Sequence, residues 1–193
     1  MGGRIGKLWS QAGHEVLFSS RNPHTLTGLT AGLQNATAGT VAEAIAFGEV
    51  ILLAVNYWTI GETLAHFEGL NRVIIDLTNP YKWSAGSGLV RAIPDAVSGA
   101  EALQSQLAGA TIVKAFSSHP ATALERHHAQ PRISVLYTCN AQAAKPIAER
   151  LISDAGFAPL YYGGLDKSKD IELYGAFSNR LMTLAEAQKE IKH

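Results

Sequence analysis

A short polar segment stands where an apolar segment of strand length ends, and its residue types suit phosphate binding. The apolar segment covers residues 15–19, and four polar side chains stand at its end, namely Ser19, Ser20, Arg21 and Asn22. In dinucleotide-binding domains an acidic residue here binds the ribose 2′-hydroxyl of NAD, whereas an arginine accommodates the 2′-phosphate of NADP. No acidic residue follows until Glu43, and arginine offers a fork of donors to phosphate oxygens. The segment therefore predicts a site for a 2′-phosphate; an ordinary polar loop is the alternative.

The residues before this strand have the pattern of a dinucleotide-binding helix. A helix is predicted to run to Ala12, and a turn at Gly13 leads into the strand. From position 2 to position 13 is eleven residues, about three helical turns and a usual helix length. We therefore assign Gly2 as the third glycine of a Gly-x-Gly-x-x-Gly fingerprint, where helix and strand pack closely. In the alternative, the glycines are merely residues at the start of a helix.

The same fingerprint predicts a strand and a Gly-x-Gly turn ahead of the helix, and neither precedes Gly2 in this sequence. In the complete strand order 3-2-1-4-5-6 that strand lies at the centre of the sheet. We therefore expect a gap between the strands at 15–19 and 49–55, lined by Leu17, Ile51 and Leu53. Three explanations stay open: a start site placed too late, a truncated chain, or a sheet that is paired again directly or through a partner chain.

Other predicted strand ends carry residues that suit a cofactor site. Ala54, Val55 and Asn56 end the strand at 49–55, where the backbone of such domains borders the ribose and nicotinamide. Small residues there permit close approach, and Tyr57 or Trp58 is a candidate wall for the ring; both aromatics are equally well explained as packing residues.

The next two strand ends hold Asn79, in the loop after the strand at 72–77, and Ala115 with Phe116, which end the strand at 111–116. Ligands of open α/β sheets bind at these carboxyl ends. Asp76 also stands here, and we expect it to be a buried structural acid rather than a catalyst.

Candidates for acid–base, metal and nucleophilic chemistry are weak. Lys114 and His119 lie near a strand end, but neither has a paired acid in the sequence. His127 and His128 are adjacent and diverge by about 100° on a helix, so they would chelate one metal ion poorly. The single cysteine, Cys139, has no CxxC partner, and no Gly-x-Ser-x-Gly elbow is present. We therefore predict neither a catalytic side chain nor a metal site.

The composition narrows the class of protein. The 193 residues carry 16 basic and 16 acidic side chains, so a nucleic-acid or anionic-membrane surface, which needs a basic excess, is not expected. No apolar run approaches the roughly 18–20 residues of a membrane span, and the N-terminus lacks the layout of a signal peptide. One cysteine suits a reducing compartment. We expect a cytoplasmic protein whose partners are small-molecule cofactors.

Apolar strands alternate with helix-period segments along the chain. Strands are expected at 15–19, 36–38, 49–55, 72–77, 111–116, 133–138 and 158–162. Helices are expected at 23–34, 41–47, 59–67, 98–107, 120–128 and 141–155, with a capping box at Ser98 and Glu101. Residues 78–97 are predicted to be a long loop. Strands that are apolar on both faces and separated by helices predict an α/β fold with a doubly wound, Rossmann-like parallel sheet that lacks its usual first strand.

The chain length favours one domain. We assign residues 1–140 to the dinucleotide-binding domain and residues 141–193 to a small C-terminal extension of it. Residues 166–192 are expected to be mostly helical and to carry the apolar side chains Ile171, Leu173, Phe177, Leu181 and Leu184. That is more apolar surface than one sheet edge covers, so a homodimer is plausible.

Six segments in this order resemble the NADPH-dependent deazaflavin (coenzyme F420) reductase-like family, which also includes the cytosolic domains of membrane metalloreductases. They are residues 12–16 (AGHEV), 19–23 (SSRNP), 53–57 (LAVNY), 75–80 (IDLTNP), 113–116 (VKAF) and 163–165 (GGL). The resemblance covers about residues 2–180. The sequence departs from the family pattern at Asn56, at Ser117-Ser118 and at residues 138–140.

The resemblance implies NADP as cofactor, a deazaflavin or flavin as second cofactor, and direct hydride transfer between the two rings. Ser20 and Arg21 would bind the 2′-phosphate, Ala54, Val55 and Asn56 would border the ribose and nicotinamide, and Ala115 and Phe116 would lie near the ring pair. Such chemistry needs orientation and exclusion of water rather than a protein acid or base. Two alternatives remain: a non-catalytic Rossmann-like binding protein with an incomplete dinucleotide site, and a dehydrogenase of a small imine or hydroxy acid.

Overall fold

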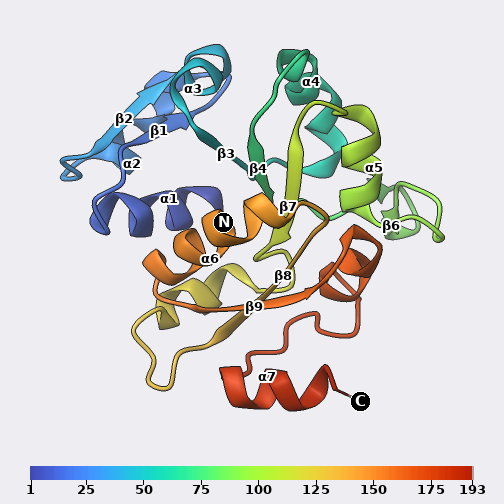
Figure 1. Cartoon of the computed structure of the whole chain (residues 1–193). Helices are drawn as coiled ribbons and strands as arrows, with labels where there is room; N and C mark the ends of the chain where they lie inside the picture. Colours follow the sequence, from blue (N-terminus) through green and yellow to red (C-terminus); the bar gives the residue numbers. More distant parts are fainter. Residues whose placement is uncertain (193) are drawn as a thin grey trace.

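The computed structural model describes residues 1–192 and contains a small parallel β-sheet, a larger and mainly parallel β-sheet, and a hairpin (Figure 1). The small sheet pairs β1 (Val16–Ser19) with β2 (Ala36–Gly39). The main sheet has the order β3-β4-β7-β8-β9. Its strands are β3 (Val50–Leu53), β4 (Val73–Asp76), β7 (Thr111–Ala115), β8 (Ser134–Cys139) and β9 (Ala158–Gly163). The α/β fold with a mainly parallel central sheet confirms the predicted class.

The sheets are separate where the sequence predicted a gap. Among residues 1–192, β1 pairs only with β2, and β3 pairs only with β4, so one edge of each strand has no neighbour. A groove of about 760 Å³ runs between the two edges, and Leu17 and Ile51 line it as expected. Leu53 does not, because its side chain turns into the core and is 2% exposed.

Helices cover both faces of the main sheet because consecutive strand residues point to opposite sides. Ile75 and Val113 pack into one cluster with residues of α1 (Gly2–Gln11) and α6 (Lys145–Asp154). Ile74 and Ile112 pack into a second cluster with α4 (Ile60–Leu64) and α5 (Gly99–Gln106). Helix α3 (Val41–Phe47) packs against β1 of the small sheet.

Helix starts follow the local sequence. The Ser98 hydroxyl accepts a hydrogen bond from the Glu101 amide at 3.1 Å, and the Glu101 carboxylate accepts one from the Ser98 amide at 2.9 Å. This capping box begins α5 where it was predicted. Equivalent boxes begin α3 at Thr40 and α7 (Leu184–Glu190) at Thr183.

One strand pair contradicts the expectation of an all-parallel sheet. β8 runs antiparallel to β7, with Lys114 opposite Thr138. The connection between them holds only the short 3₁₀ helix Ala121–Arg126, whereas a parallel crossover usually needs a full helix across the sheet. Apolar residues on both faces indicate burial and carry no information about strand direction.

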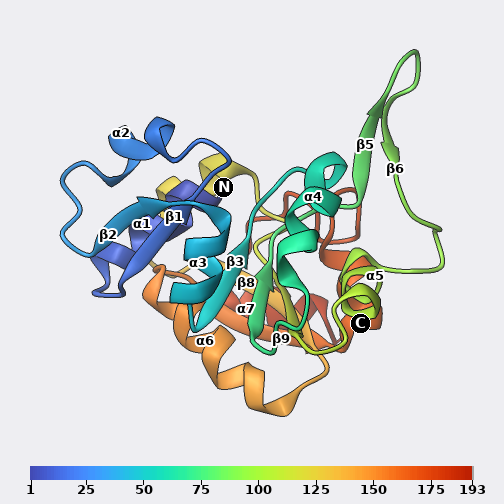
Figure 2. The same cartoon turned by 90° about the horizontal axis from the view of Figure 1, so that it is seen from above.

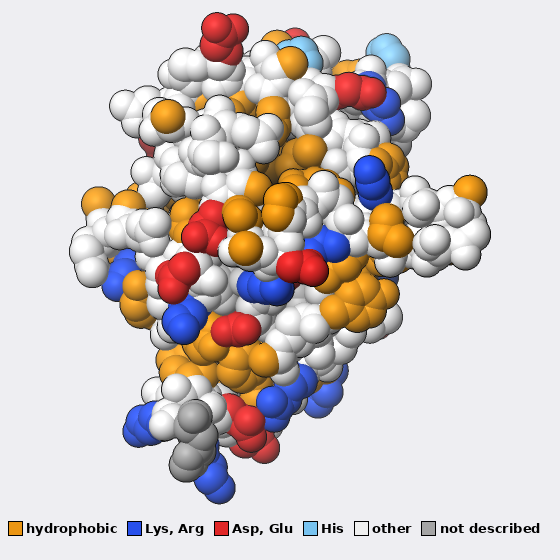
Figure 3. Space-filling model, turned by 90° about the vertical axis from the view of Figure 1, so that its right-hand side faces the viewer, with side chains coloured by type: hydrophobic (Ala, Val, Ile, Leu, Met, Phe, Trp, Pro, Cys, Tyr) orange, Lys and Arg blue, Asp and Glu red, His pale blue; other side chains and the backbone are white. Residues whose placement is uncertain are grey.

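The predicted loop at 78–97 is wrong in part, because it contains a hairpin. β5 (Tyr81–Ser84) pairs with β6 (Gly88–Arg91), and the hairpin projects from the body of the molecule (Figure 2). Trp83 on this hairpin is 74% exposed. The surface that faces the viewer in Figure 3 carries charges of both signs, with hydrophobic side chains gathered between them.

Two predicted helices are also wrong. Residues 23–34 hold only the 3₁₀ helix Pro23–Leu26 and the short α2 (Thr27–Thr30). Residues 166–192 hold the 3₁₀ helix Leu165–Ile171 and α7, with irregular chain between them. Ile171 and Phe177 are buried in the chain's own core, so the helix on which the homodimer was predicted is absent from this region. No helix within residues 1–192 has the length and apolar character needed to cross a membrane.

The other predicted helices are shorter or change type. Residues 59–67 contain the 3₁₀ turn Tyr57–Thr59, then α4, then the 3₁₀ turn Ala65–Phe67. Residues 141–155 contain the 3₁₀ turn Gln142–Ala144 and then α6, with Pro146 in the first turn of α6. A proline there costs no hydrogen bond, because the first amides of a helix have no intrahelical acceptor.

Candidate functional site

The predicted site residues gather at one edge of the fold, where β1, β3, β4 and β7 end. Arg21, just beyond β1, forms an ion pair with Glu62 on α4, just beyond β3, at 3.2 Å. This contact places the carboxyl ends of the two separate sheets on the same edge. β3, β4 and β7 are mutually parallel, so their ends meet there as well.

The segment after β1 is accessible to a ligand. The Ser20 amide donates to the Gly39 carbonyl at 3.3 Å, and the Ser20 hydroxyl accepts a hydrogen bond from the Asn22 amide at 3.2 Å. Ser19, Arg21 and Asn22 are exposed. The Arg21 side chain is 79% exposed, and its pair with Glu62 is weak because water and salt screen it. A phosphate group can therefore compete with Glu62 for the guanidinium.

The start of α1 lies against the end of β3. A Cβ atom on Gly2 would come 2.7 Å from the Cβ of Ala54, so only glycine permits this approach. A Cβ atom on Gly6 would come 2.3 Å from the ring of Phe18, so α1 packs directly on β1 at Gly6. The structure thus brings Gly2 and Ala54 together as two sides of one opening, and Asn56, two residues further along the chain, is exposed.

A buried network of charges lies under the ends of β4 and β7. The ammonium group of Lys114 donates to the Asp76 carboxylate at 2.9 Å and to the Thr78 carbonyl, and it lies 4.0 Å from the Glu172 carboxylate. Glu172 also accepts hydrogen bonds from Arg91 at 3.3 Å and from the Gly99 amide at 2.6 Å. Lys114, Asp76 and Glu172 are 0% exposed. The network joins two sheet strands, the hairpin and the C-terminal segment.

The sequence alone does not point to two members of this network, Glu172 and Arg91. It offers no paired acid for Lys114, whereas the buried ion pair with Lys114 gives Asp76 the structural role that the sequence predicts. The available signal was an acidic residue between Ile171 and Leu173, since a charge inside an apolar segment must be paired when it is buried.

Tyr57 stands at the rim of the network. Burial raises the pKa of its phenol above the ordinary value, and the Asp76 and Glu172 carboxylates raise it further, while Arg91 opposes them. The phenol is therefore protonated at neutral pH and available as a hydrogen-bond donor. Trp58, the other aromatic residue proposed as a wall for the ring, is 59% exposed.

Asn79 and the residues after β7 shape this edge from below. The Asn79 amide group donates to the Ser117 carbonyl at 3.1 Å and accepts from the Leu173 amide at 2.7 Å. Ala115 is 0% exposed and Phe116 is 1% exposed. Phe116 has a φ of 61°, unusual for a bulky residue. At this burial neither the backbone nor the side chain of Ala115 or Phe116 is open to a ligand, so the structure shows no accessible surface for their predicted contact with a ring pair.

His119 is a structural residue. One ring nitrogen lies 3.1 Å from the Ser118 hydroxyl, and the other lies 3.1 Å from the Ser134 carbonyl. Burial lowers its pKa to about 4, although the hydrogen bond to Ser134 opposes the shift. A neutral imidazole with both nitrogens engaged is not free to exchange protons with a substrate. Within residues 1–192, no three His, Cys, Asp or Glu side chains form a metal site.

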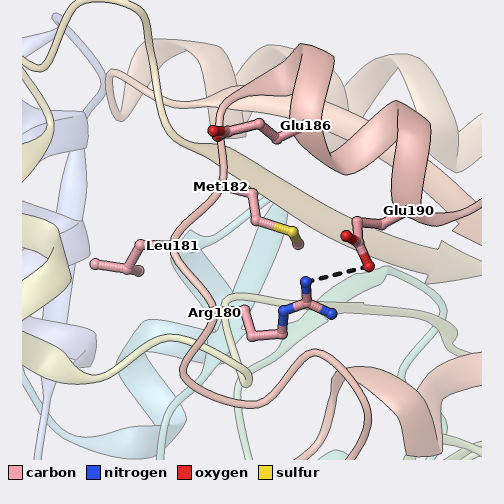
Figure 4. A pocket seen from close by; sticks show the side chains of 5 residues that line it. All are labelled: Arg180, Leu181, Met182, Glu186 and Glu190. Carbon is pink, nitrogen blue, oxygen red and sulfur yellow. Dashed lines mark ion pairs between the residues drawn. The ribbon is translucent and has the colours of Figure 1, made fainter.

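A second hollow lies beside α7 (Figure 4). Its volume is about 360 Å³, and Arg180 crosses it to pair with Glu190 at 3.1 Å. Met182 and Glu186 also line it, and no predicted site residue does. It is therefore separate from the strand ends.

The chain resembles known proteins in sequence and in fold. Residues 1–80 match the model of the family "NADP oxidoreductase coenzyme F420-dependent". The metalloreductase STEAP3 of Rattus norvegicus is 28% identical over 164 residues, which cover 83% of this chain and 31% of that protein. The chain thus spans about a third of the length of this curated relative.

Two solved structures share the fold. A hypothetical protein, SMa0349 from Sinorhizobium meliloti, superimposes with a TM-score of 0.81 at 22% identity, covering 94% of this chain and 90% of that one. A proposed F420-dependent NADP reductase from Arthrobacter sp. FB24 gives a TM-score of 0.76 at 20% identity, with coverage of 86% and 82%. With the family match over residues 1–80, the predicted resemblance to the coenzyme F420-dependent NADP oxidoreductases is confirmed.

Proposed function

We propose that this protein binds NADP(H) and transfers hydride between the nicotinamide and a deazaflavin or flavin. The observation that carries the proposal is the exposed Arg21 guanidinium beyond β1, with Ser20 and Asn22 beside it in the chain and no acidic residue in the segment that follows β1. An arginine there is the feature by which dinucleotide-binding folds accept a 2′-phosphate. The family match over residues 1–80 supports the same cofactor.

The strand ends are better suited to binding a nicotinamide ring than to acid–base catalysis by a side chain. When bound, the nicotinamide supplies or accepts the hydride. The chain's own part is to orient the two rings and to exclude water from them. Gly2 and Ala54 leave room for close approach, and Tyr57 offers a neutral donor at the rim. The charges of Asp76, Lys114, Glu172 and Arg91 balance, so the network fixes the edge without a net charge beneath the ring.

The C-terminal segment is the part we assign to the second cofactor. Glu172 fastens this segment to β7 through Lys114, and the Leu173 amide bonds to Asn79 at 2.7 Å. Tyr174, the next residue, is 69% exposed and packs edge-to-face on Tyr81 with a centroid distance of 5.2 Å. Aromatic rings at this place are suited to stacking on a flat heterocycle.

A calorimetric titration with NADPH and separately with NADH tests the cofactor assignment. We expect the wild-type chain to prefer NADPH. Arg21→Ala should weaken NADPH binding by about 10- to 100-fold, the range for one charge-assisted hydrogen bond, and should leave NADH binding unchanged.

Arg150→Ala is the matched control, because Arg150 is 75% exposed and also pairs with an acid, Asp154, on α6. It should leave both affinities unchanged. Equal losses for NADPH and NADH in Arg21→Ala would contradict the assignment of Arg21 to the 2′-phosphate.

A second candidate function is a binding protein without catalysis. The burial of Ala115 and Phe116 favours it, because these two residues then offer no accessible surface to a ring pair. Oxidation of NADPH by coenzyme F420 or by FMN, followed by absorbance, separates the two. NADPH binding without turnover with either acceptor would favour the second candidate.

Two further proposals concern the location and the assembly of the protein. Cys139 is buried and free, and a free thiol suits a reducing compartment, so we propose a cytoplasmic location. A homodimer stays a prediction, and size-exclusion chromatography with light scattering checks it.

A further inference from the structure

Tyr174 has a backbone conformation that a bulky side chain disfavours. Its φ is 66°, in the left-handed region, where a residue of this size is an outlier. Such a conformation persists only where the surrounding structure holds it, and it is concentrated at ligand-binding sites. The ring gains little burial in return, because Tyr174 is 69% exposed. The packing of the fold therefore does not explain why a tyrosine stands at this position.

Glu172 anchors the chain on the amino-terminal side of Tyr174. Glu172 is 0% exposed, and its carboxylate accepts hydrogen bonds from the Gly99 amide at 2.6 Å and from Arg91 at 3.3 Å. The same carboxylate lies 4.0 Å from the ammonium group of Lys114. A buried carboxylate cannot leave such partners without a large loss of free energy. Glu172 therefore fixes the point from which Tyr174 extends.

The backbone is also fixed on both sides of Tyr174. The Leu173 amide donates to the side-chain oxygen of Asn79 at 2.7 Å, and the Gly175 amide donates to the Glu172 carbonyl at 3.0 Å. A Cβ atom on Gly175 would collide with carbonyl groups of the preceding 3₁₀ helix, so the chain turns here without spare room. Neighbouring residues thus hold Tyr174 in the left-handed conformation.

The exposed ring stands on the edge that the proposed function assigns to the cofactors. Tyr174 packs edge-to-face on Tyr81 of β5, with a centroid distance of 5.2 Å. The 3₁₀ turn Tyr57–Thr59, which follows the end of β3, packs against β5 as well. Tyr57 is the neutral donor that we place beside the nicotinamide. The Tyr174 ring is therefore on the same edge as the proposed nicotinamide site.

We propose that Tyr174 is the specificity-determining residue for the second cofactor, because it stacks on a flat fused-ring heterocycle, and that Glu172 is its positioning residue. The held backbone presents the ring before the ligand arrives, so binding does not have to order this side chain. The inference rests on the proposed function, which takes the second cofactor to be a flavin or deazaflavin. It adds the side chain that contacts the ring and the buried group that holds this side chain.

Fluorescence titrations with FMN and separately with coenzyme F420 test the ring contact. We expect the wild-type chain to bind at least one of these fluorescent heterocycles. Tyr174→Phe keeps the aromatic ring and should bind it equally well. Tyr174→Ala and Tyr174→Gly remove the ring, and both should bind about tenfold more weakly or worse, as expected for the loss of one stacked aromatic side chain.

Thermal unfolding of the same variants tests whether the backbone is held. Glycine adopts a positive φ freely, whereas alanine does not. Tyr174→Gly should therefore unfold about 2–4 °C above Tyr174→Ala, the shift expected for relief of modest strain in a chain of this size.

Asn179→Gly is the matched control for the backbone. Asn179 is also exposed and also has a positive φ, of 58°, but asparagine tolerates this conformation. The change should leave the affinity for FMN and for coenzyme F420 unchanged and should shift the unfolding temperature little.

A double-mutant cycle tests the positioning role of Glu172. Glu172→Gln keeps an acceptor for the Gly99 amide and removes the charge that faces Lys114 and Arg91. It should weaken binding of the heterocycle about threefold or more when Tyr174 is present and have no further effect in Tyr174→Gly, since the loss acts through the ring. Glu172→Asp, which keeps the charge on a shorter side chain, provides a second and milder variant for the same cycle.

Four results would overturn the inference. The wild type could bind neither heterocycle, or Tyr174→Ala could bind as well as Tyr174→Phe, which would mean that the ring makes no contact. Equal unfolding temperatures of the Ala and Gly variants would show that the backbone is not held. Equal losses from Glu172→Gln in both backgrounds would limit Glu172 to a structural role.

A titration of the wild type with NADPH separates these results from failure of the proposed function. Binding of FMN or coenzyme F420 that depends on Tyr174, in a chain that does not bind NADPH, would contradict the proposed function and support the ring contact. NADPH binding together with a heterocycle affinity that is insensitive to Tyr174 would do the reverse.

Discussion

Lys114 shows how a charged residue at a strand end acquires a structural role. Its side chain is fully buried and has no contact with water. The ammonium group is surrounded by two carboxylates and one backbone carbonyl. Burying a charge is tolerated only when it is paired and hydrogen-bonded. The pair itself adds little net stability, but removal of one partner leaves uncompensated charges in the interior.

We therefore expect Lys114→Met to lower the free energy of unfolding by about 3–5 kcal/mol, because Asp76 and Glu172 then lose their shared cation. The double variant Lys114→Met with Asp76→Asn should recover part of this loss, since one of the two orphaned charges is gone. Urea denaturation of the two variants and the wild type measures the difference. Equal stability of single and double variants would show that Asp76 does not depend on Lys114.

His119 predicts a pH dependence of stability. Its pKa is about 4 in the folded chain, where burial disfavours the imidazolium, against an ordinary value near 6.5 when unfolded. The unfolded chain therefore binds the proton first, and stability is lost as the pH falls from about 6.5 to about 4. The shift corresponds to about 3 kcal/mol across this window.

Thermal or urea unfolding at a series of pH values checks this for the wild type and His119→Gln. Other carboxyl and imidazole groups titrate in the same window, so the difference between the two proteins is the relevant quantity. It should shrink toward low pH. A constant difference between pH 7 and pH 4 would contradict the assigned pKa.

The helix starts differ in how much they contribute. The Ser98 hydroxyl is buried; it caps α5 and also donates to the Leu165 carbonyl at 2.7 Å. The Thr183 hydroxyl caps α7 near the surface, at 3.4 Å from the Glu186 amide. A cap alone contributes about 1 kcal/mol, and a buried carbonyl that loses its donor costs about 1–3 kcal/mol.

Ser98→Ala should therefore destabilise the protein by about 2–4 kcal/mol, the sum of the cap and the orphaned Leu165 carbonyl. Thr183→Ala, the matched change on a half-exposed cap, should cost only about 1 kcal/mol. Chemical denaturation at neutral pH provides both values. If the two variants were equally stable, the bond to Leu165 would be of no consequence.

The errors in the element predictions share one cause. The hairpin β5–β6 was missed because each strand has only four residues and Trp83 points into solvent, so no apolar alternation marks it. Helix 166–192 was predicted from its apolar residues, yet Ile171 and Phe177 reach the core from a 3₁₀ turn and an irregular segment. Apolar spacing reports burial, and over such short segments it does not decide between helix, strand and loop.

The two sheets differ in how many buried contacts stabilise them. β4, β7 and β8 lie inside the main sheet between two layers of helices, whereas β1 and β2 share no strand pairing with it. The small sheet is attached through helix packing and through exposed contacts such as Arg21 with Glu62. Opening of the small sheet therefore disrupts fewer buried contacts than opening of the main sheet.

Native-state hydrogen exchange should separate the two sheets. We expect ladder amides of β1 and β2 to exchange at least tenfold faster than those of β4, β7 and β8, because local opening suffices for the former and near-global unfolding is required for the latter. Identical protection in both sheets would mean that they unfold as one cooperative unit.

The sequence by itself determined the α/β class, the succession of the main strands along the chain, the cap at Ser98 and the gap beside β1. These follow from local patterns: apolar segments of strand length, hydroxyl and acid pairs three residues apart, and glycines at a helix start. The polar segment from Ser19 to Asn22 was visible for the same reason, since it is contiguous in the chain.

Only the tertiary structure decided which residues meet. Lys114, Asp76, Glu172 and Arg91 are separated by 15 to 96 positions in the sequence, and no local pattern joins them. Contacts between segments that are distant in the sequence also decide the antiparallel direction of β8, the burial of Phe116 and the facing edges of β1 and β3. Burial and ion pairing depend on these tertiary contacts, so only the assembled sheets and helices reveal them.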